Sequence, residues 1–156
     1  MMLKKIFPAS ADNNFDGNNI ALWGFVIFTA AMTWRSIIHM FFEQYGFHEI
    51  ASFILIEGNP DPMPIIYRFF SLWGFAQLIF CFICWIVIFR YRALIPLMYL
   101  FWLVEWGYRT IGYSLTREEI AIQGIYTNSI TPGIVLAPYV LLLLIILFAL
   151  SLKSKN

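Results

Sequence analysis

A few charged side chains interrupt the long apolar stretches of this sequence. Arg35 and His39 lie in one stretch, and Glu105 and Arg109 lie in another, with the members of each pair four positions apart. Four positions are about one helical turn, so the members of each pair share one face of a helix. An unpaired charge near the middle of a membrane costs at least ~2.5 kcal/mol. We therefore expect these side chains to point into a helix bundle and to contact one another or a polar ligand.

Two interpretations of these polar residues stay open. In the first, Glu105 bridges Arg35 and Arg109 across helices and only stabilises the bundle, with His39 as a hydrogen-bonding residue at the interface. In the second, the arginines outnumber the carboxylate and form a partly wet pocket for an anionic head group, a carboxylate or a quinone oxygen. Ion conduction is disfavoured, because the first stretch has no titratable group on the inner side of Arg35. The candidate pocket residues are Arg35, His39, Arg68, Gln77, Trp102, Glu105 and Arg109.

The composition predicts the elements that position these side chains. Of the 156 residues, 61% are hydrophobic and only 12% are charged, against about 25% charged residues in soluble domains. This composition excludes a soluble domain and favours an all-α integral membrane protein. Since a membrane-spanning helix needs about 20 mostly apolar residues, we predict a four-transmembrane-helix bundle. The predicted spans are residues 20–42, 66–89, 93–114 and 133–152.

The rise of a helix places the polar side chains at a common depth. Arg35 lies roughly 22 Å along the first span and Glu105 roughly 18 Å along the third, counted from the same side. Gln77 lies roughly 16 Å along the second span, counted from the opposite side. All three fall in the outer half of an apolar core about 30 Å thick. Arg68 lies near the outer end of the second span, opposite Gln77 on the helix, so its side chain can also extend to the interface.

Positive charge lies on one side of this even-numbered topology. Cytoplasmic loops retain Lys and Arg, so we predict that this side is cytoplasmic and that the protein lies in a bacterial-type cell (inner) membrane. Residues 1–19 and 153–156 are then cytoplasmic tails, and residues 20–152 form a single transmembrane domain. The six cations are Lys4, Lys5, Arg90, Arg92, Lys153 and Lys155.

Both outer loops contain further elements. The apolar run of residues 50–56 is too short to span a membrane, and the turn-forming residues 57–62 follow it. We therefore predict a short interfacial or re-entrant segment in the first outer loop. In the second loop, residues 116–119 resemble a capping box that begins a short helix. We expect this helix to act as a lid or a spacer.

A four-residue sequence occurs twice, at residues 22–25 and 72–75, as Leu-Trp-Gly-Phe. An inverted repeat of two halves would need more shared residues than these four. Glycine allows two helices in a membrane to approach closely. We therefore interpret Gly24 and Gly74 as helix-contact positions.

Cys81 and Cys84 form a C-x-x-C pair. The pair resembles the redox motif of the membrane disulfide-generating oxidoreductases and vitamin K epoxide reductases, and the resemblance covers these four positions only. Those families use a second cysteine pair, whereas this chain has two cysteines in all. Cys84 also lies roughly 27 Å below the outer start of its span. Burial raises a thiol pKa and makes the thiol inert, so we interpret both cysteines as packing residues.

Other chemistries lack their residues. The two histidines and two cysteines provide no zinc motif, and His48 lies in a loop, so bis-histidine haem ligation is improbable. A net charge of +1 gives no reason to expect nucleic acid. We predict no cofactor and expect membrane lipids as partners, with a larger membrane complex or a homo-oligomer as further options. The expected function is that of an accessory subunit or a lipid- or quinone-binding bundle. The alternative is a small membrane enzyme or carrier for a lipid-like anionic or quinone-like substrate.

Overall fold

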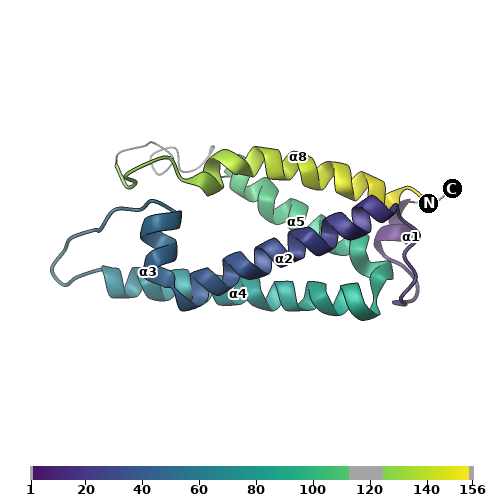
Figure 1. The fold of residues 1–156 in the computed structure, drawn as a ribbon, viewed down its shortest axis with the longest axis horizontal. Coiled ribbons are helices and arrows are strands. Elements are labelled where there is room, and N and C mark those ends of the chain that lie inside the picture. The colour runs from purple at the N-terminus through teal and green to yellow at the C-terminus, as the bar shows by residue number, and fades with distance from the viewer. Residues whose placement is uncertain (1, 113–124, 155–156) are drawn as a thin grey trace.

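The computed structural model describes residues 2–112 and 125–154, and the described chain is helical apart from its connections. Four helices form the body of the molecule (Figure 1). They are α2 (Asn19–Phe41), α4 (Met63–Arg90), α5 (Ile95–Gly107) and α8 (Pro132–Leu152). The short elements are α1 (Met2–Ile6), α3 (Glu43–Tyr45), η1 (Gly46–Ile50), η2 (Arg92–Leu94) and η3 (Tyr108–Gly112).

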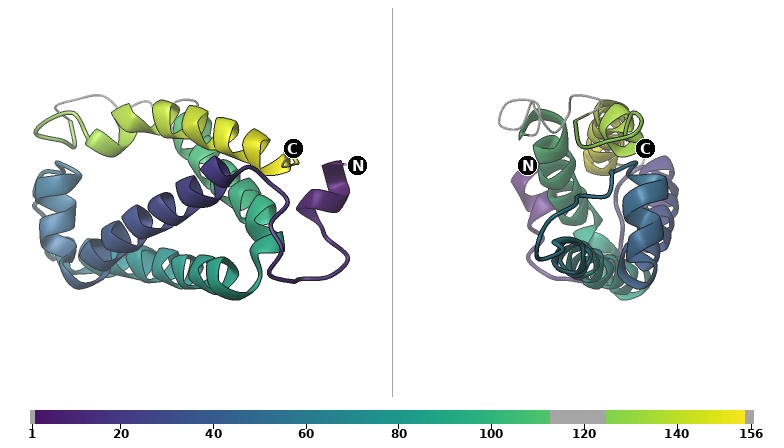
Figure 2. Two further views of the ribbon diagram at one scale, coloured as in Figure 1. Left: turned by 45° about the vertical axis from the view of Figure 1, so that its right-hand side comes forward. Right: turned by 90° about the vertical axis from the view of Figure 1, so that its left-hand side faces the viewer.

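Helices α2 and α5 run diagonally between α4 and α8 and cross midway (Figures 1 and 2). Helix α2 packs chiefly on α4, and α5 packs chiefly on α8. Both chain termini and the α4–α5 connection lie at one end of the molecule, called here the terminal end. Helix α3 lies at the opposite end, called here the loop end, where it turns away from the direction of α2. The two helix pairs are therefore joined at the crossing and separate towards the loop end.

Within residues 2–112 and 125–154, three helices are long and apolar enough to cross a membrane, namely α2, α4 and α8. They cover three of the predicted spans and differ from them by at most a few residues at each end. Helix α2 begins after Asn18, whose side chain accepts a hydrogen bond from the Ile20 amide at 2.8 Å. Helix α4 begins three residues before the predicted window, after Pro62 at the N-cap, and Asp61 Oδ1 accepts a hydrogen bond from the Met63 amide at 2.9 Å.

The third predicted span, residues 93–114, corresponds to a helix with three hydrogen-bonding patterns. It begins as the 3₁₀ turn η2, continues as α5 and ends as the π-helical turn η3. Pro96 lies in the first turn of α5, where a missing amide hydrogen is tolerated. Residues 113–114 and the predicted capping box at 116–119 lie outside the described residues.

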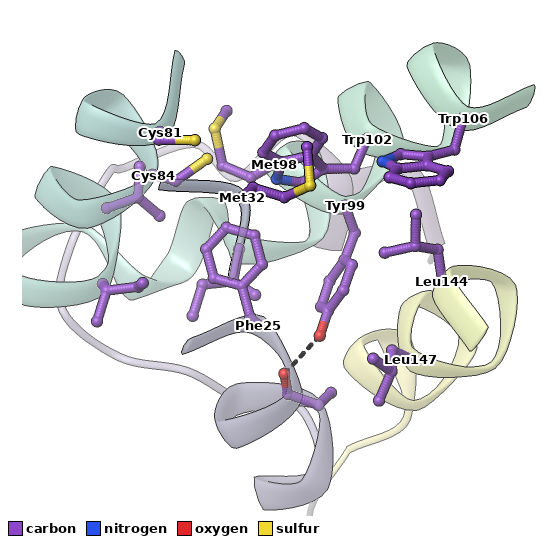
Figure 3. Packing of buried hydrophobic residues seen from close by; sticks show 14 of the residues in the cluster. Phe25, Met32, Cys81, Cys84, Met98, Tyr99, Trp102, Trp106, Leu144 and Leu147 are labelled. Atoms are coloured by element: carbon purple, nitrogen blue, oxygen red, sulfur yellow. Dashed lines mark hydrogen bonds between the residues drawn. The ribbon is translucent and has the colours of Figure 1, made fainter. Parts of the chain in front are cut away.

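Contacts between distant segments close the terminal end. Lys5 Nζ donates to the Leu152 carbonyl at 3.0 Å, and the Asn18 amide donates to the Leu150 carbonyl at 3.1 Å. The Tyr99 hydroxyl donates to the Ala21 carbonyl at 2.7 Å, which joins α5 to the start of α2 (Figure 3). The cations of α1, of the α4–α5 turn and Lys153 therefore lie at one end, as predicted from the charge pattern, and Lys155 lies outside the described residues.

Pairing between the two connections closes the loop end. The Ile54 amide donates to the Tyr126 carbonyl at 3.0 Å, and the Asn128 amide donates to the Ser52 carbonyl at 2.8 Å. The helical part of the first connection is Glu43–Ile50, formed by α3 and η1, and it precedes most of the apolar run predicted as an interfacial or re-entrant segment. The rest of that run is not helical beyond Ala51: Ser52 has a φ of 61°, and Phe53 forms an isolated antiparallel bridge with Thr127, so the second connection satisfies part of this backbone.

A sulfur-rich and aromatic core fills the crossing of the helices (Figure 3). Cys81 and Cys84 are fully buried free thiols, as expected for packing residues. Gly74 lies against the α2 backbone, where a Cβ atom would be 2.7 Å from the Met40 nitrogen. Gly24 lies against the Leu147 side chain of α8. Both glycines of the repeated sequence are therefore helix-contact positions.

Candidate functional site

A chain of polar contacts joins α2, α4 and α5 on the loop side of the crossing. Arg35 Nη1 donates to Gln77 Oε1 at 2.8 Å, and Gln77 Nε2 donates to Glu105 Oε1 at 2.9 Å. Arg109 binds the same Glu105 oxygen through Nε at 2.8 Å and through Nη2 in an ion pair. We call Arg35, Gln77, Glu105 and Arg109 the polar cluster. It gathers two guanidinium groups and one carboxylate from helices that belong to different pairs.

One contact of the polar cluster differs from the interpretation in which Glu105 bridges Arg35 and Arg109. Glu105 pairs with Arg109 as expected for an acid and a base four residues apart. Arg35 reaches that carboxylate through the Gln77 amide rather than directly. Ser36 Oγ also lies 3.4 Å from Gln77 Oε1. An amide has both a donor and an acceptor, so Gln77 can connect a guanidinium to a carboxylate across the helix crossing.

The indole ring of Trp73 lies beside both guanidinium groups. Its centroid is 4.8 Å from Arg35 Cζ and 4.9 Å from Arg109 Cζ. A ring face attracts a cation, and this attraction strengthens where water is excluded. Trp73 therefore stabilises two positive charges that would otherwise repel each other between the same helices.

His39 lies next to the polar cluster but bonds to its own helix. Its Nδ1 donates to the Arg35 carbonyl at 2.6 Å, since a carbonyl oxygen can only accept. Its ring stacks on Phe70 at 4.6 Å between centroids and meets the edge of Trp73 at 5.1 Å. His39 is 2% exposed, so its ring is buried and packs beside Trp73.

Trp102 lies on α5 in the hydrophobic core rather than in the polar cluster. The ring is fully buried and packs against Phe28 at 5.1 Å and Phe80 at 4.7 Å between centroids. Phe28 also contacts Trp106, which lies one turn further along α5. Trp102 and Trp106 belong to the hydrophobic core at the crossing (Figure 3).

Several buried polar atoms of α2 and α5 lack a hydrogen-bond partner. Among the described residues these are Glu105 Oε2 in the polar cluster, Trp106 Nε1, whose ring centroid lies 5.3 Å from Arg109 Cζ, and the atoms Trp102 Nε1 and Thr29 Oγ1. A buried group left unsatisfied costs about 1–3 kcal/mol. The side chains of Glu105 and Arg109 are 31% and 15% exposed, so the ion pair is not sealed within the chain. One carboxylate acceptor and one indole donor close to Arg109 are therefore left unsatisfied by the described residues.

Arg68 does not belong to the polar cluster. It is exposed and lines an open groove of about 820 Å³ between the ends of α2 and α3 and the start of α4. Five of the seven candidate residues therefore lie together, whereas Trp102 lies in the hydrophobic core and Arg68 lies in a separate groove. The five are Arg35, His39, Gln77, Glu105 and Arg109. The predicted set of pocket residues did not include Trp73. Its position four residues before Gln77 places it on the face of α4 that carries Gln77.

No family model, no curated protein and no solved structure matches this chain. Function must therefore be inferred from the residues of the polar cluster and from the helices that hold them.

Proposed function

We propose that this chain is a four-span membrane protein that binds a lipid-like or quinone-like molecule at the polar cluster. The observation that carries the proposal is the unsatisfied pair of atoms, Glu105 Oε2 and Trp106 Nε1, beside two guanidinium groups. A ligand whose polar end holds both a hydroxyl donor and an acceptor oxygen would satisfy both atoms. Quinols and the hydroxyl-bearing or phosphate-bearing head groups of lipids have this chemistry.

The direction of the helices supports a ligand with an apolar tail. The polar cluster links the α2–α4 pair to α5, and the two helix pairs separate towards the loop end (Figure 2). The surfaces of these helices expose many large apolar side chains. A head group bound at the polar cluster could leave its tail among these apolar side chains, where it replaces lipid. Association with a larger membrane complex, in which the chain acts as an accessory subunit, stays a prediction.

The fourth span of this proposal is the continuous helix formed by η2, α5 and η3. It contains Glu105 and Arg109, and their mutual pairing lowers the cost of placing either charge in a membrane. The terminal end is proposed to be cytoplasmic because the cations of α1 and of the α4–α5 turn lie there. With four spans, Asn59 and the terminal end lie on opposite sides of a cell membrane.

Cysteine labelling tests this topology. We expect Asn59→Cys to react with a membrane-impermeant maleimide from outside intact cells, and Ser154→Cys to react only after the membrane is opened. Both positions are exposed. The native thiols of Cys81 and Cys84 are fully buried, so they should contribute little background. Labelling of both introduced cysteines from the same side would contradict an even number of spans.

Ligand retention tests the polar cluster. Replacing Arg35 by methionine keeps the Glu105–Arg109 pair and should therefore leave the protein folded. A hydrogen bond to a charged group contributes about 1.5–3 kcal/mol, so the variant should retain at least about tenfold less of the lipid or quinone that co-purifies with the parent. The measurement is mass spectrometry of organic extracts from the detergent-purified protein, normalised to protein.

The matched control is Arg90→Met, which removes an exposed arginine at the other end of α4. We expect this variant to retain the molecule held at the polar cluster as the parent does. A second variant, Trp106→Phe, keeps an aromatic ring but removes the unsatisfied Nε1 donor and should also reduce retention. Equal amounts of the same molecules in the parent and in the Arg35 and Trp106 variants would leave the polar cluster with a structural role only.

A further inference from the structure

The groove that contains Arg68 has the size and the polarity of a binding site. Its volume of about 820 Å³ lies within the roughly 300–1,000 Å³ of small-molecule pockets. One wall comes from the end of α2 and from α3, and the other comes from the first turns of α4. Ser71 Oγ donates to the Met40 carbonyl at 2.8 Å and holds the two walls together at the base of the groove.

Charges of both signs line the outer part of this groove. Glu43 and Asp61 provide two carboxylates, and Arg68 provides one guanidinium. Arg68 is exposed and Glu43 is half-buried, so neither is sealed within the chain. Two acids and one base match a zwitterion, in which an ammonium group meets carboxylates and a phosphate meets a guanidinium. The same set disfavours a head group that is only anionic, because its charge would face the two acids.

The inner part of the groove is apolar and open. Leu72 and Phe75 line it one and two turns beyond Arg68, and they are 58% and 42% exposed. In a membrane these side chains lie next to acyl chains, whereas the charged part lies at the interface near the start of α4. The order from charged to apolar along the groove is the order from head group to tail in a phospholipid.

We propose that this groove binds a phospholipid whose zwitterionic head group bears a primary amine, as in phosphatidylethanolamine. The ammonium group donates hydrogen bonds to the carboxylates of Glu43 and Asp61, and the phosphate accepts from the guanidinium of Arg68. The first part of an acyl chain lies on Leu72 and Phe75. The proposal rests on the membrane insertion proposed above but not on a ligand at the polar cluster, because the two sites share no residue.

Lipid selection in nanodiscs tests the groove. The full chain is reconstituted with equal parts of phosphatidylethanolamine, phosphatidylcholine and phosphatidylglycerol, and the lipids that stay bound are identified by native mass spectrometry. We expect enrichment of phosphatidylethanolamine over phosphatidylglycerol, which lacks the amine. We also expect enrichment over phosphatidylcholine, whose quaternary ammonium cannot donate an N–H hydrogen bond. A parent protein that retains the three lipids equally, or that prefers phosphatidylglycerol, overturns the proposal.

Charge-neutral variants separate the two halves of the head group. The double variant Glu43→Gln/Asp61→Asn should lose the preference for the amine, with about a tenfold fall in the ratio of phosphatidylethanolamine to phosphatidylglycerol. Asparagine at position 61 still provides an oxygen for the Met63 amide, so α4 keeps its start. Arg68→Gln should weaken retention of both lipids by about tenfold, because both carry the phosphate.

Matched controls neutralise charges outside the groove. Glu57→Gln lies in the same connection and Arg90→Gln lies at the other end of α4, and both residues are exposed. These variants should keep the lipid preference of the parent, and equal losses in control and groove variants would overturn the proposal.

Soluble phosphoethanolamine should not displace the bound lipid, because it lacks the chain that contacts Leu72 and Phe75. Displacement by it would show that the groove binds a free head group rather than a phospholipid. If the groove variants retain the molecule bound at the polar cluster as the parent does, a negative result of the lipid test concerns the groove alone.

Discussion

Replacing Glu105 by glutamine should destabilise the protein by about 3 kcal/mol, which is the lower end of the roughly 3–5 kcal/mol lost when one partner of a buried ion pair is removed. Glu105 Oε1 accepts from Gln77 and from two nitrogens of Arg109. The variant leaves the guanidinium of Arg109 without its counter-charge, and that side chain is only 15% exposed. The partial exposure of Glu105 favours the lower end of the range. The measurement is reversible unfolding by denaturing detergent, followed by circular dichroism.

The double variant Glu105→Met/Arg109→Met distinguishes a lost pair from a lost residue. Replacing a whole ion pair by apolar side chains of similar size is often close to neutral, so the double variant should be more stable than the Glu105→Gln single variant. Glu57→Gln is the control, because this exposed carboxylate should change the unfolding free energy by no more than about 0.5 kcal/mol. A single variant as stable as the parent would show that the carboxyl group faces water.

Replacing Gly74 by alanine should cost about 1–3 kcal/mol, the usual penalty for extra atoms in a packed interface. The added Cβ would lie 2.7 Å from the Met40 nitrogen and 2.8 Å from the His39 carbonyl carbon, both of which belong to the α2 backbone. Backbone atoms of a helix cannot move aside individually, so α2 and α4 must separate. The same movement would shift His39 away from Trp73, which it contacts at 5.1 Å between centroids.

Two other glycines provide matched controls for the Gly74 variant. Gly107 has no atom within 4 Å of an added Cβ atom, so Gly107→Ala should be neutral or should stabilise by up to about 1 kcal/mol through helix propensity. Gly24→Ala meets only the Leu147 side chain, which can rotate, so its cost should lie between those of the other two variants. The order of the three unfolding free energies is the result to check. An equal effect at all three positions would show that close backbone contact is not what selects glycine at position 74.

Local periodicity accounts for what could be predicted from the sequence. Apolar windows of about 20 residues predicted α2, α4 and α8, because a helix that spans the apolar core of a membrane needs an apolar run of about that length. The four-residue spacing of Glu105 and Arg109 determined their contact, since both belong to one helix. The charge pattern predicted that the two termini lie at one end. An even number of helices that alternate in direction gives the same arrangement.

The tertiary structure decided which residues from different helices meet. The rotation of α2 and α4 about their axes depends on the close contact at Gly74, and it brings Arg35 to Gln77 rather than to Glu105. The same rotation puts Trp73 beside both guanidinium groups.

The division between the two sites also depended on the tertiary structure. Arg68 lies on another face of α4 from Gln77, and the turn of the chain into α3 forms a groove around it. Residues 52–54 pair with residues 126–128, a contact between segments more than seventy residues apart. Helical spacing is a local property of the sequence, whereas helix rotation, crossing and loop pairing depend on the packing of many side chains at once. The sequence by itself therefore determined which apolar windows form long helices and which polar side chains each helix carries, and only the tertiary packing decided which of these side chains meet.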